Sequence, residues 1–266
     1  MLSVAMTIAG SDPSGGAGLQ ADLKTFHQHG VYGTSVVTLF TVQNTRTVLE
    51  VETLEPRFVL AQLDAVLDDI PPGAAKTGAL GTAAVIEIVA HRLARCRFPL
   101  VVDPVMISKH GLALLDHDAA QVMRSQLLPH AYLVTPNSLE AAVLAEMSVE
   151  DQASMEKAAA AIGRMGPRHV LVKGGHLTEE ATDVLWSDGE VLRFPGQRID
   201  TQNTHGSGCV FSAAITARLA RGENLVDAIR AAKRFITQAI RQNPCLGGGR
   251  GPTNLHVDVR DLNSES

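Results

Sequence analysis

Short apolar segments alternate with longer segments of helical spacing along most of the chain. Five of the apolar segments are predicted strands, at residues 4–9, 35–41, 99–102, 131–134 and 169–172. Each is apolar on both faces, which is typical of parallel strands that helices cover on both sides. The predicted helices lie between them, at residues 19–29, 55–69, 83–95, 118–127, 139–145 and 155–165. This alternation predicts an α/β fold with a mostly parallel central sheet flanked by helices.

The pattern changes after Trp186. Residues 187–190, Ser-Asp-Gly-Glu, predict a hairpin turn between strands at 181–186 and 191–194. Two helices are predicted next, at 209–221 and 225–242, and Gly222 is a suitable C-terminal stop for the first of them. The most informative polar residues come just after strands, which is where ligands bind in such sheets.

Composition limits the class of protein. The 266 residues are 45% hydrophobic and 19% charged, which is typical of one compact domain spanning residues 1–266, with a flexible tail only at about 258–266. A net charge of −5 argues against nucleic acid as a partner, because strand and duplex binding needs a basic face. No apolar stretch reaches the roughly 20 residues that a membrane span needs.

The cysteines suggest a compartment. Cys96, Cys209 and Cys245 are widely spaced and form no C-x-x-C pair, so the sequence predicts neither a disulfide framework nor a zinc site. A reducing cytoplasm fits this pattern. Cys96 and Cys245 are interpreted as small buried hydrophobic residues.

Cys209 differs from the other two because of its neighbours. Gly206-Ser207-Gly208-Cys209 begins a predicted helix, where several backbone N–H groups and the positive end of the helix dipole converge on one point. A glycine-rich helix cap is the commoner explanation of an isolated G-x-G, and the cysteine in the first turn shifts the balance towards a site. If the site is chemical, we expect the helix start to lower the pKa of the Cys209 thiol, making it a candidate nucleophile or base with His205 as a possible activator.

A first glycine-rich loop, residues 10–18, follows the first strand. It lacks the Lys-Ser/Thr ending of a Walker A loop. Gly16, Gly18 and Ala21 match the spacing of a dinucleotide fingerprint, but the second strand ends without the acidic residue that would hold a ribose. A nicotinamide cofactor is therefore disfavoured, and the loop is either a wide connection or a backbone wall against a small ligand.

Three more strand ends carry polar residues with two interpretations each. Asn137 and Glu140 have the spacing of a capping box. Lys173 ends a buried strand, where it either reaches solvent or holds a phosphate. Asp103 is a candidate site residue or simply starts a turn.

Together these segments resemble one family, because six motifs occur in its order. They lie at residues 9–22, 43–45, 103–106, 135–140, 173–176 and 203–209, and the likeness continues to residue 256. The chain resembles the hydroxymethylpyrimidine/phosphomethylpyrimidine kinases of thiamine biosynthesis, within the ribokinase-like superfamily. The resemblance implies a three-layer sandwich, a homodimer, and ATP-dependent phosphorylation of 4-amino-5-hydroxymethyl-2-methylpyrimidine and then of its monophosphate.

The resemblance also implies roles for individual residues. The helix start would stabilise the transferred phosphoryl group, and Cys209 would deprotonate or orient the substrate hydroxyl. Gln43 would bind the edge of the pyrimidine, since its amide offers both a donor and an acceptor. The expected catalytic residues are Gly206, Ser207, Gly208 and Cys209; the substrate pocket is Gly10, Ala17, Gln43, Val105 and Met106; ATP would contact Asn137, Lys173 and Thr204; and Mg²⁺ would lie near Glu140 and Asp103.

Three alternatives stay open at this stage. Pyridoxal or pyridoxine kinase is the nearest, because that vitamin also has a hydroxymethyl-bearing ring. A non-catalytic pyrimidine-binding protein of the same fold is the second, and turnover through a covalent Cys209 adduct is the third. One departure from the family is Ala79, where its members often carry methionine, and it predicts a roomier pocket floor.

Overall fold

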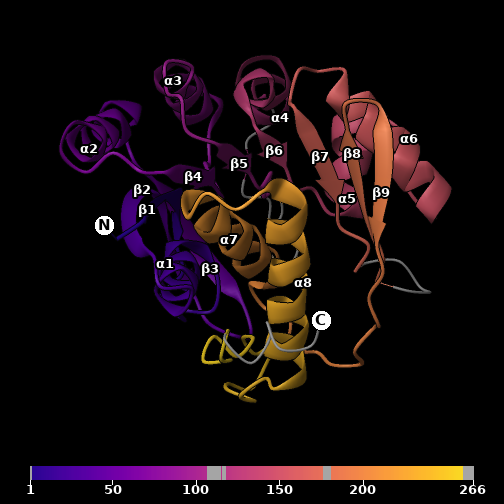
Figure 1. Ribbon diagram of the computed structural model, residues 1–266. Coiled ribbons are helices and arrows are strands. Elements are labelled where there is room, and N and C mark those ends of the chain that lie inside the picture. The colour runs from indigo at the N-terminus through magenta and orange to yellow at the C-terminus, as the bar shows by residue number, and fades with distance from the viewer. Residues whose placement is uncertain (1, 107–114, 116–117, 176–180, 260–266) are drawn as a thin grey trace.

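A nine-stranded mixed sheet forms the centre of the protein (Figure 1). The computed structural model describes residues 2–106, 115, 118–175 and 181–259. Its strands are β1 Val4–Ser11, β2 Tyr32–Gln43, β3 Val48–Thr53, β4 Ala74–Thr77, β5 Leu100–Val102, β6 Leu133–Val134, β7 His169–Val172, β8 Asp183–Ser187 and β9 Glu190–Phe194. Their order across the sheet is β3-β2-β1-β4-β5-β6-β7-β8-β9. From β2 to β7 neighbouring strands are parallel, whereas β3, β8 and β9 pair in the antiparallel sense.

Helices cover both faces of this sheet. They are α1 Gly18–Gln28, α2 Pro56–Asp69, α3 Ala83–Leu93, α4 Ala119–Val122, α5 Ser138–Ala145, α6 Gln152–Gly163, α7 Ser207–Ala220 and α8 Leu225–Arg241. Helices α1, α7 and α8 lie together on one face, and α2 to α6 lie towards the other (Figure 1). Successive strand residues therefore enter different cores: Val102 packs with α3, while Val101 packs with α7 and α8. The predicted three-layer α/β fold is confirmed.

The five predicted strands and the hairpin are present, but two strands were missed. β3 has no buried residue and carries glutamates at positions 50 and 52, so it lacks a buried strand's composition. β4 has the sequence Ala-Ala-Lys-Thr and is wholly buried despite its lysine. The prediction that every strand is covered on both faces is wrong for β2, whose later part extends outward with β3 and exposes Phe40 and Val42.

The helix predicted at 118–127 is not a regular α-helix. It is α-helical only over Ala119–Val122 and winds as a π-helix over Met123–Leu127. A 3-10 turn, Leu128–His130, follows and contains Pro129, which has no backbone N–H to continue the helical hydrogen bonds. Gly222 ends α7 with a left-handed φ of 84°, as predicted. Val259, within the predicted tail, is buried in the core, and residues 260–266 lie outside the described part of the chain.

His29 is buried where α1 ends, against α7 and α8. Its ring meets Phe235 edge-on at 4.7 Å, and Arg221 donates to its backbone carbonyl. Within the described residues neither imidazole nitrogen has a hydrogen-bond partner. Burial lowers the pKa of His29 to about 3, with further lowering by the charges of Arg218 and Arg221. His29 is therefore held neutral.

The topology places a site at one edge of the sheet. The chain leaves β1 for β2 on one side and returns to β4 on the other, so the direction of winding reverses between β1 and β4. Loops at the carboxyl ends of parallel strands diverge at such a reversal and leave a crevice. The loops after β1, β4, β5, β6 and β7 all emerge at this edge, and α7 begins beneath them.

Candidate active site

A cavity of about 1010 Å³ opens at the carboxyl edge of the sheet. It brings together all fourteen residues singled out from the sequence: Gly10, Ala17, Gln43, Asp103, Val105, Met106, Asn137, Glu140, Lys173, Thr204, Gly206, Ser207, Gly208 and Cys209. Ala79 also lines it, so the shorter side chain at this position does face the pocket. The cavity is large enough for a nucleotide beside a small ring, since typical ligand pockets are about 300–1,000 Å³.

The two glycine-rich loops are in direct contact. Gly206, the N-cap of α7, has a left-handed φ of 73°, and a Cβ there would lie 1.8 Å from the carbonyl oxygen of Gly16. At Gly18 the φ is 56°, and a Cβ would lie 2.3 Å from the carbonyl oxygen of Gly10. Both positions therefore require glycine for conformation and for space. The Ser207 N–H, at the start of α7, donates to the Thr204 carbonyl at 3.2 Å. The next N–H groups of the first turn have no intrahelical acceptors, so they are available to an anion.

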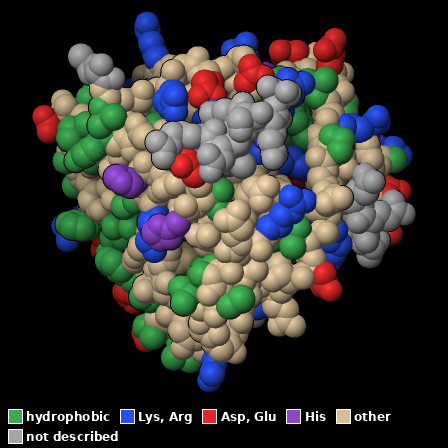
Figure 2. All heavy atoms as spheres, turned by 60° about the horizontal axis from the view of Figure 1, so that its bottom comes forward, with side chains coloured by type: hydrophobic (Ala, Val, Ile, Leu, Met, Phe, Trp, Pro, Cys, Tyr) green, Lys and Arg blue, Asp and Glu red, His purple; other side chains and the backbone are tan. Residues whose placement is uncertain are grey.

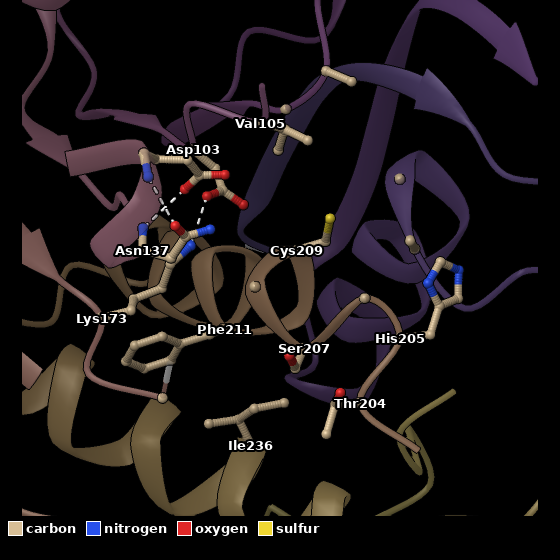
Figure 3. Close-up of a pocket in the computed structure, with 18 of the residues that line it drawn as sticks. Asp103, Val105, Asn137, Lys173, Thr204, His205, Ser207, Cys209, Phe211 and Ile236 are labelled. Atoms are coloured by element: carbon tan, nitrogen blue, oxygen red, sulfur yellow. Dashed lines mark hydrogen bonds and ion pairs between the residues drawn. The ribbon is translucent and has the colours of Figure 1, made fainter. Parts of the chain in front are cut away.

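Cys209 lies in that first turn, and its sulfur faces the cavity (Figure 3). The backbone N–H of Gly18, at the start of α1, donates to the sulfur, so two helix N-termini meet there. Desolvation by burial nevertheless raises the pKa of the thiol to about 12, although the charge of Lys76 opposes this. The expectation of a lowered pKa was wrong: the loss of water around the sulfur outweighs the helix dipoles.

Lys173 and Asp103 form an ion pair beside the start of α7. Lys173 Nζ lies 2.9 Å from Asp103 Oδ1, and Ser212 Oγ donates to Asp103 Oδ2 at 3.1 Å. Burial of Asp103 raises its pKa, but the charges of Lys173 and Lys76 and the hydrogen bonds outweigh this, so the pKa is lowered overall. A Cβ on Gly208 would lie 3.2 Å from Lys173 Nζ. The missing side chain at Gly208 thus leaves room for an ammonium group directly over the helix start.

Asn137 and Glu140 form the predicted capping box at the start of α5. Asn137 Oδ1 accepts from the Glu140 N–H at 2.9 Å, and Glu140 Oε2 accepts from the Asn137 N–H at 2.8 Å. Burial raises the pKa of Glu140 to about 7, and Asp103 adds to the rise while Lys173 opposes it. The box holds the Glu140 side chain at the cavity wall, where the charges of Lys173 and Asp103 both act on it.

Gln43, at the end of β2, meets the turn before α7. Its Nε2 lies 3.2 Å from His205 Nε2, and its Oε1 lies 3.2 Å from Thr41 Oγ1. The same His205 nitrogen lies 2.8 Å from Asp12 Oδ2. Burial raises the pKa of Asp12, but hydrogen bonds from His205 and Ser14 outweigh it and lower the pKa overall. His205 therefore joins Gln43 to the first glycine-rich loop and does not contact Cys209 as an activator would.

The sequence interpretation missed a buried ion pair in the cavity wall. Lys76 Nζ binds both Asp22 oxygens, at 2.9 and 2.8 Å, and Asp22 also accepts from Thr7 Oγ1. Both side chains are wholly buried. A lysine inside an otherwise apolar segment, with an aspartate far earlier on the first helix, is the only signal that the sequence offered.

The apolar end of the cavity was also missed. Phe211 and Ile236 form a wall on the side away from Val105, between α7 and α8 (Figure 3). Thr237 and Ile240 continue this wall along α8. These residues follow ordinary helical spacing, so their sequence pattern is that of any core helix.

The cysteines, possible metal ligands, helix lengths and surface charges can be compared with what the composition predicts. All three cysteines are free, but Cys245 is exposed and Cys96 half-buried, so their interpretation as buried hydrophobic residues was wrong. Among the described residues no group of three or more His, Cys, Asp or Glu could hold a metal ion by itself. None of the described helices is long and apolar enough to cross a membrane. Acidic and basic side chains are interspersed on the face shown in Figure 2.

Comparison with known proteins decides the family. The sequence pattern described as phosphomethylpyrimidine kinase matches residues 12–254. The chain belongs to the phosphomethylpyrimidine kinase family. The hydroxymethylpyrimidine/phosphomethylpyrimidine kinase of Rhizobium meliloti is 47% identical over 258 residues, covering 96% of this chain and 97% of that protein. The predicted family and kinase class are confirmed.

Two further relatives extend the comparison. A thiamine biosynthesis bifunctional protein of Geobacter sulfurreducens is 48% identical over 262 residues, covering 96% of this chain. The chain spans only 53% of that protein's length. A Bacillus subtilis pyridoxal kinase solved as an ADP complex superposes with a TM-score of 0.89 at 39% identity, covering 98% of this chain and 99% of that one.

Proposed function

We propose that the protein transfers the γ-phosphoryl group of ATP to the hydroxymethyl group of 4-amino-5-hydroxymethyl-2-methylpyrimidine, and then to the monophosphate so formed. One domain, residues 1–266, would carry both reactions. The observation that carries the proposal is the meeting, in one cavity, of the α7 start, the Lys173 ammonium and the Gln43 amide. The first two suit a phosphoryl group, and the third suits an aminopyrimidine.

The phosphoryl side of the proposed mechanism relies on positioning and electrostatics. Phosphoryl transfer leaves little covalent chemistry to the protein, so fixed positive charge and N–H donors supply most of the catalysis. The start of α7, at Gly206, Ser207 and Gly208, would face the transferred group with its positive end. Lys173 would neutralise phosphate charge, and Asn137 and Thr204 would also contact ATP. The adenine would lie against the apolar wall of Phe211 and Ile236.

The ring would lie at the opposite end of the cavity. Gly10 and Ala17 permit close approach of the backbone, and Val105 and Met106 supply apolar contact. Cys209 would face the reacting hydroxyl. Since burial keeps the thiol protonated, its proposed role is to orient that hydroxyl, whose proton would pass to an oxygen of the phosphoryl group late in the transfer.

Mg²⁺ fits the carboxylates at this site as an ion that arrives with the nucleotide. Mg²⁺ commonly binds through one or two carboxylates plus phosphate oxygens and water, so a dedicated protein cage is not needed. Glu140 and Asp103 would be those carboxylates, and Asp103 is the more occupied because Lys173 and Ser212 already donate to it. When bound, Mg²⁺ would neutralise charge on the phosphate oxygens.

Phosphorus NMR tests the proposal directly. Purified protein with ATP, Mg²⁺ and hydroxymethylpyrimidine is expected to give the pyrimidine monophosphate first and the diphosphate later, with ADP formed in step. Consumption of ATP without a pyrimidine phosphate would refute it. Binding of the pyrimidine without turnover would instead favour a non-catalytic binding protein.

Pyridoxal kinase remains a second candidate, because the superposition on the Bacillus subtilis enzyme covers nearly the whole chain. Gln43 favours the pyrimidine, since its amide matches an amino group beside a ring nitrogen. We expect a higher kcat/KM for hydroxymethylpyrimidine than for pyridoxal, measured with the same ADP-coupled assay. The reverse order would transfer the proposal to pyridoxal.

We also propose a homodimer that works in the cytoplasm. The β2–β3 extension exposes Phe40, Val42 and Leu49 by 48%, 50% and 71%, which supports contact with a second copy. Light scattering during size-exclusion chromatography would give twice the chain mass. A monomer across a wide concentration range would contradict it.

A further inference from the structure

One ring nitrogen of His205, Nε2, lies within hydrogen-bond distance of both Asp12 and Gln43. Whether it can bond to both depends on which way the Gln43 amide faces. Asp12 Oδ2 lies 2.8 Å from His205 Nε2, and Gln43 Nε2 lies 3.2 Å from the same atom. Asp12 is 3% exposed and also accepts from the Ser14 N–H, the Ser14 hydroxyl and the Ala17 N–H. A carboxylate with this donor set only accepts, so His205 Nε2 must carry the hydrogen that it shares with Asp12.

A protonated Nε2 conflicts with the amino end of the Gln43 side chain. Two N–H groups would face each other at 3.2 Å, with no acceptor between them. The other end of the amide has a second conflict. Thr41 Oγ1 lies 3.2 Å from Gln43 Oε1 but has a single hydrogen, and the carbonyl of Ser11 takes that hydrogen at 3.0 Å.

A half-turn of the amide removes both conflicts. With Oε1 towards His205, the Nε2–H of the imidazole is shared between the Asp12 carboxylate and the Gln43 oxygen. With the amino group towards Thr41, Gln43 donates to Oγ1, which in turn donates to Ser11. Each end then has a partner of opposite kind, and the heavy atoms keep their places.

We infer that the Asp12–His205 pair fixes the Gln43 amide with its oxygen towards His205, which makes His205 a positioning residue for substrate specificity. This inference rests on the proposed function, in which Gln43 binds the pyrimidine edge. A fixed amide offers one oxygen lone pair and one N–H to the ring at set places. In this orientation the amide oxygen can accept from the 4-amino group of the ring and the amide N–H can donate to the neighbouring ring nitrogen. A 4-oxo ring has a carbonyl beside a ring N–H, so it needs the amide reversed.

The test compares two substrates in wild-type and variant proteins. We measure kcat/KM for the 4-amino pyrimidine and for its 4-oxo analogue. In the wild type the 4-amino compound is expected to be preferred by at least about 100-fold, because a site built for a hydrogen bond rejects the wrong pattern strongly. In His205→Phe the amide is free to rotate, so the preference should fall at least about tenfold, with KM for the pyrimidine rising more than kcat falls.

Two further variants separate this role from general damage. Thr41→Val removes the other anchor of the amide, is nearly isosteric, and should also narrow the preference; it decides the question if His205→Phe does not fold. Ser14→Ala removes a donor to Asp12 but leaves the contacts of His205 with Asp12 and Gln43, so the preference should stay at the wild-type value.

The outcomes are distinguishable. Wild-type transfer to the 4-amino pyrimidine, with the same substrate preference in folded His205→Phe and Thr41→Val, would overturn this inference alone. Failure of the wild type to phosphorylate either ring would overturn the proposed function and this inference with it. A smaller preference for the 4-amino ring in His205→Phe and Thr41→Val, with an unchanged preference in Ser14→Ala, would support the proposed function and this inference.

Discussion

The state of the Cys209 thiol can be read from its reaction with iodoacetamide. Only the thiolate is alkylated, so the rate follows the thiolate fraction. With a pKa of about 12, only about one thiol in 10⁴ is ionised near pH 8. An ordinary thiol, with a pKa of about 8.5, is about one quarter ionised there, which is roughly 2,000 times more.

Part of this difference is recovered in the reactivity of the thiolate. Nucleophilicity rises with pKa with a Brønsted slope of about 0.4–0.5, which over about 3.5 pKa units gives roughly 40-fold. The net expectation is alkylation of Cys209 about 50-fold slower than an ordinary thiol near pH 8. The sharper signature is the pH profile, in which the rate should rise about tenfold per pH unit with no plateau up to about pH 10.

The assay uses a protein whose only cysteine is Cys209, made by Cys96→Ser and Cys245→Ala, with the adduct counted by intact mass. A matched protein that keeps only the exposed Cys245 reports how the reagent itself responds to pH. A plateau at or below about pH 8.5 would refute the reasoning, because it would mean that the two helix N-termini overcome desolvation. Cys209 would then be available as a base in the resting protein.

Three other substitutions have definite expected outcomes. Gly208→Ala places a Cβ 3.2 Å from Lys173 Nζ, so we expect at least a tenfold loss of kcat/KM for ATP by steady-state kinetics, although alanine in the helix should raise stability by about 0.5–1 kcal/mol. The folded-state pKa of His29 is lowered from 6.5 to about 3, so below pH 6.5 the unfolded chain binds a proton that the folded protein does not. The contribution of His29 to the free energy of unfolding is therefore complete above pH 6.5 and falls by about 1.4 kcal/mol per pH unit towards pH 3. Between pH 6.5 and 5, the free energy of unfolding in urea should therefore fall by about 2 kcal/mol less in His29→Phe than in the wild type. An equal fall in both proteins would contradict this. Lys76→Met leaves the buried Asp22 without its cationic partner, costing about 3–5 kcal/mol in denaturant unfolding. Adding Asp22→Leu should recover part of this cost, and no recovery would show that the cost is packing alone.

The sequence predicted the sheet and its helices where a segment's composition reflected its burial. It failed at β4, because Lys76 reaches an aspartate 54 residues earlier, and such a pair depends on the fold and not on local pattern. It failed at β3, which pairs with β2 at the edge of the sheet and has no buried residue. The cavity residues were predicted well because each follows a strand end or a glycine turn, and parallel strands bring such positions to one edge.

Two properties of the site could not be read from the chain alone. A helix start predicts a stabilised thiolate at Cys209, but the opposing effect is the water removed by surrounding side chains, which no local motif records. The link from Asp12 through His205 to Gln43 joins residues as far as 193 positions apart. The sequence therefore suggested His205 only as an activator of Cys209.

The contact between the two glycine-rich loops also bears on how this enzyme can change over evolution or in the laboratory. The carbonyl of Gly16 occupies the place where any side chain at Gly206 would lie, so neither loop can shift without the other. Substitutions in residues 10–18 and 204–209 should therefore be epistatic, and a change harmful in one loop should be tolerated only with a partner change in the other. Transplanting the phosphate-binding turn from a relative, without its loop from the first strand, should yield a protein that folds poorly.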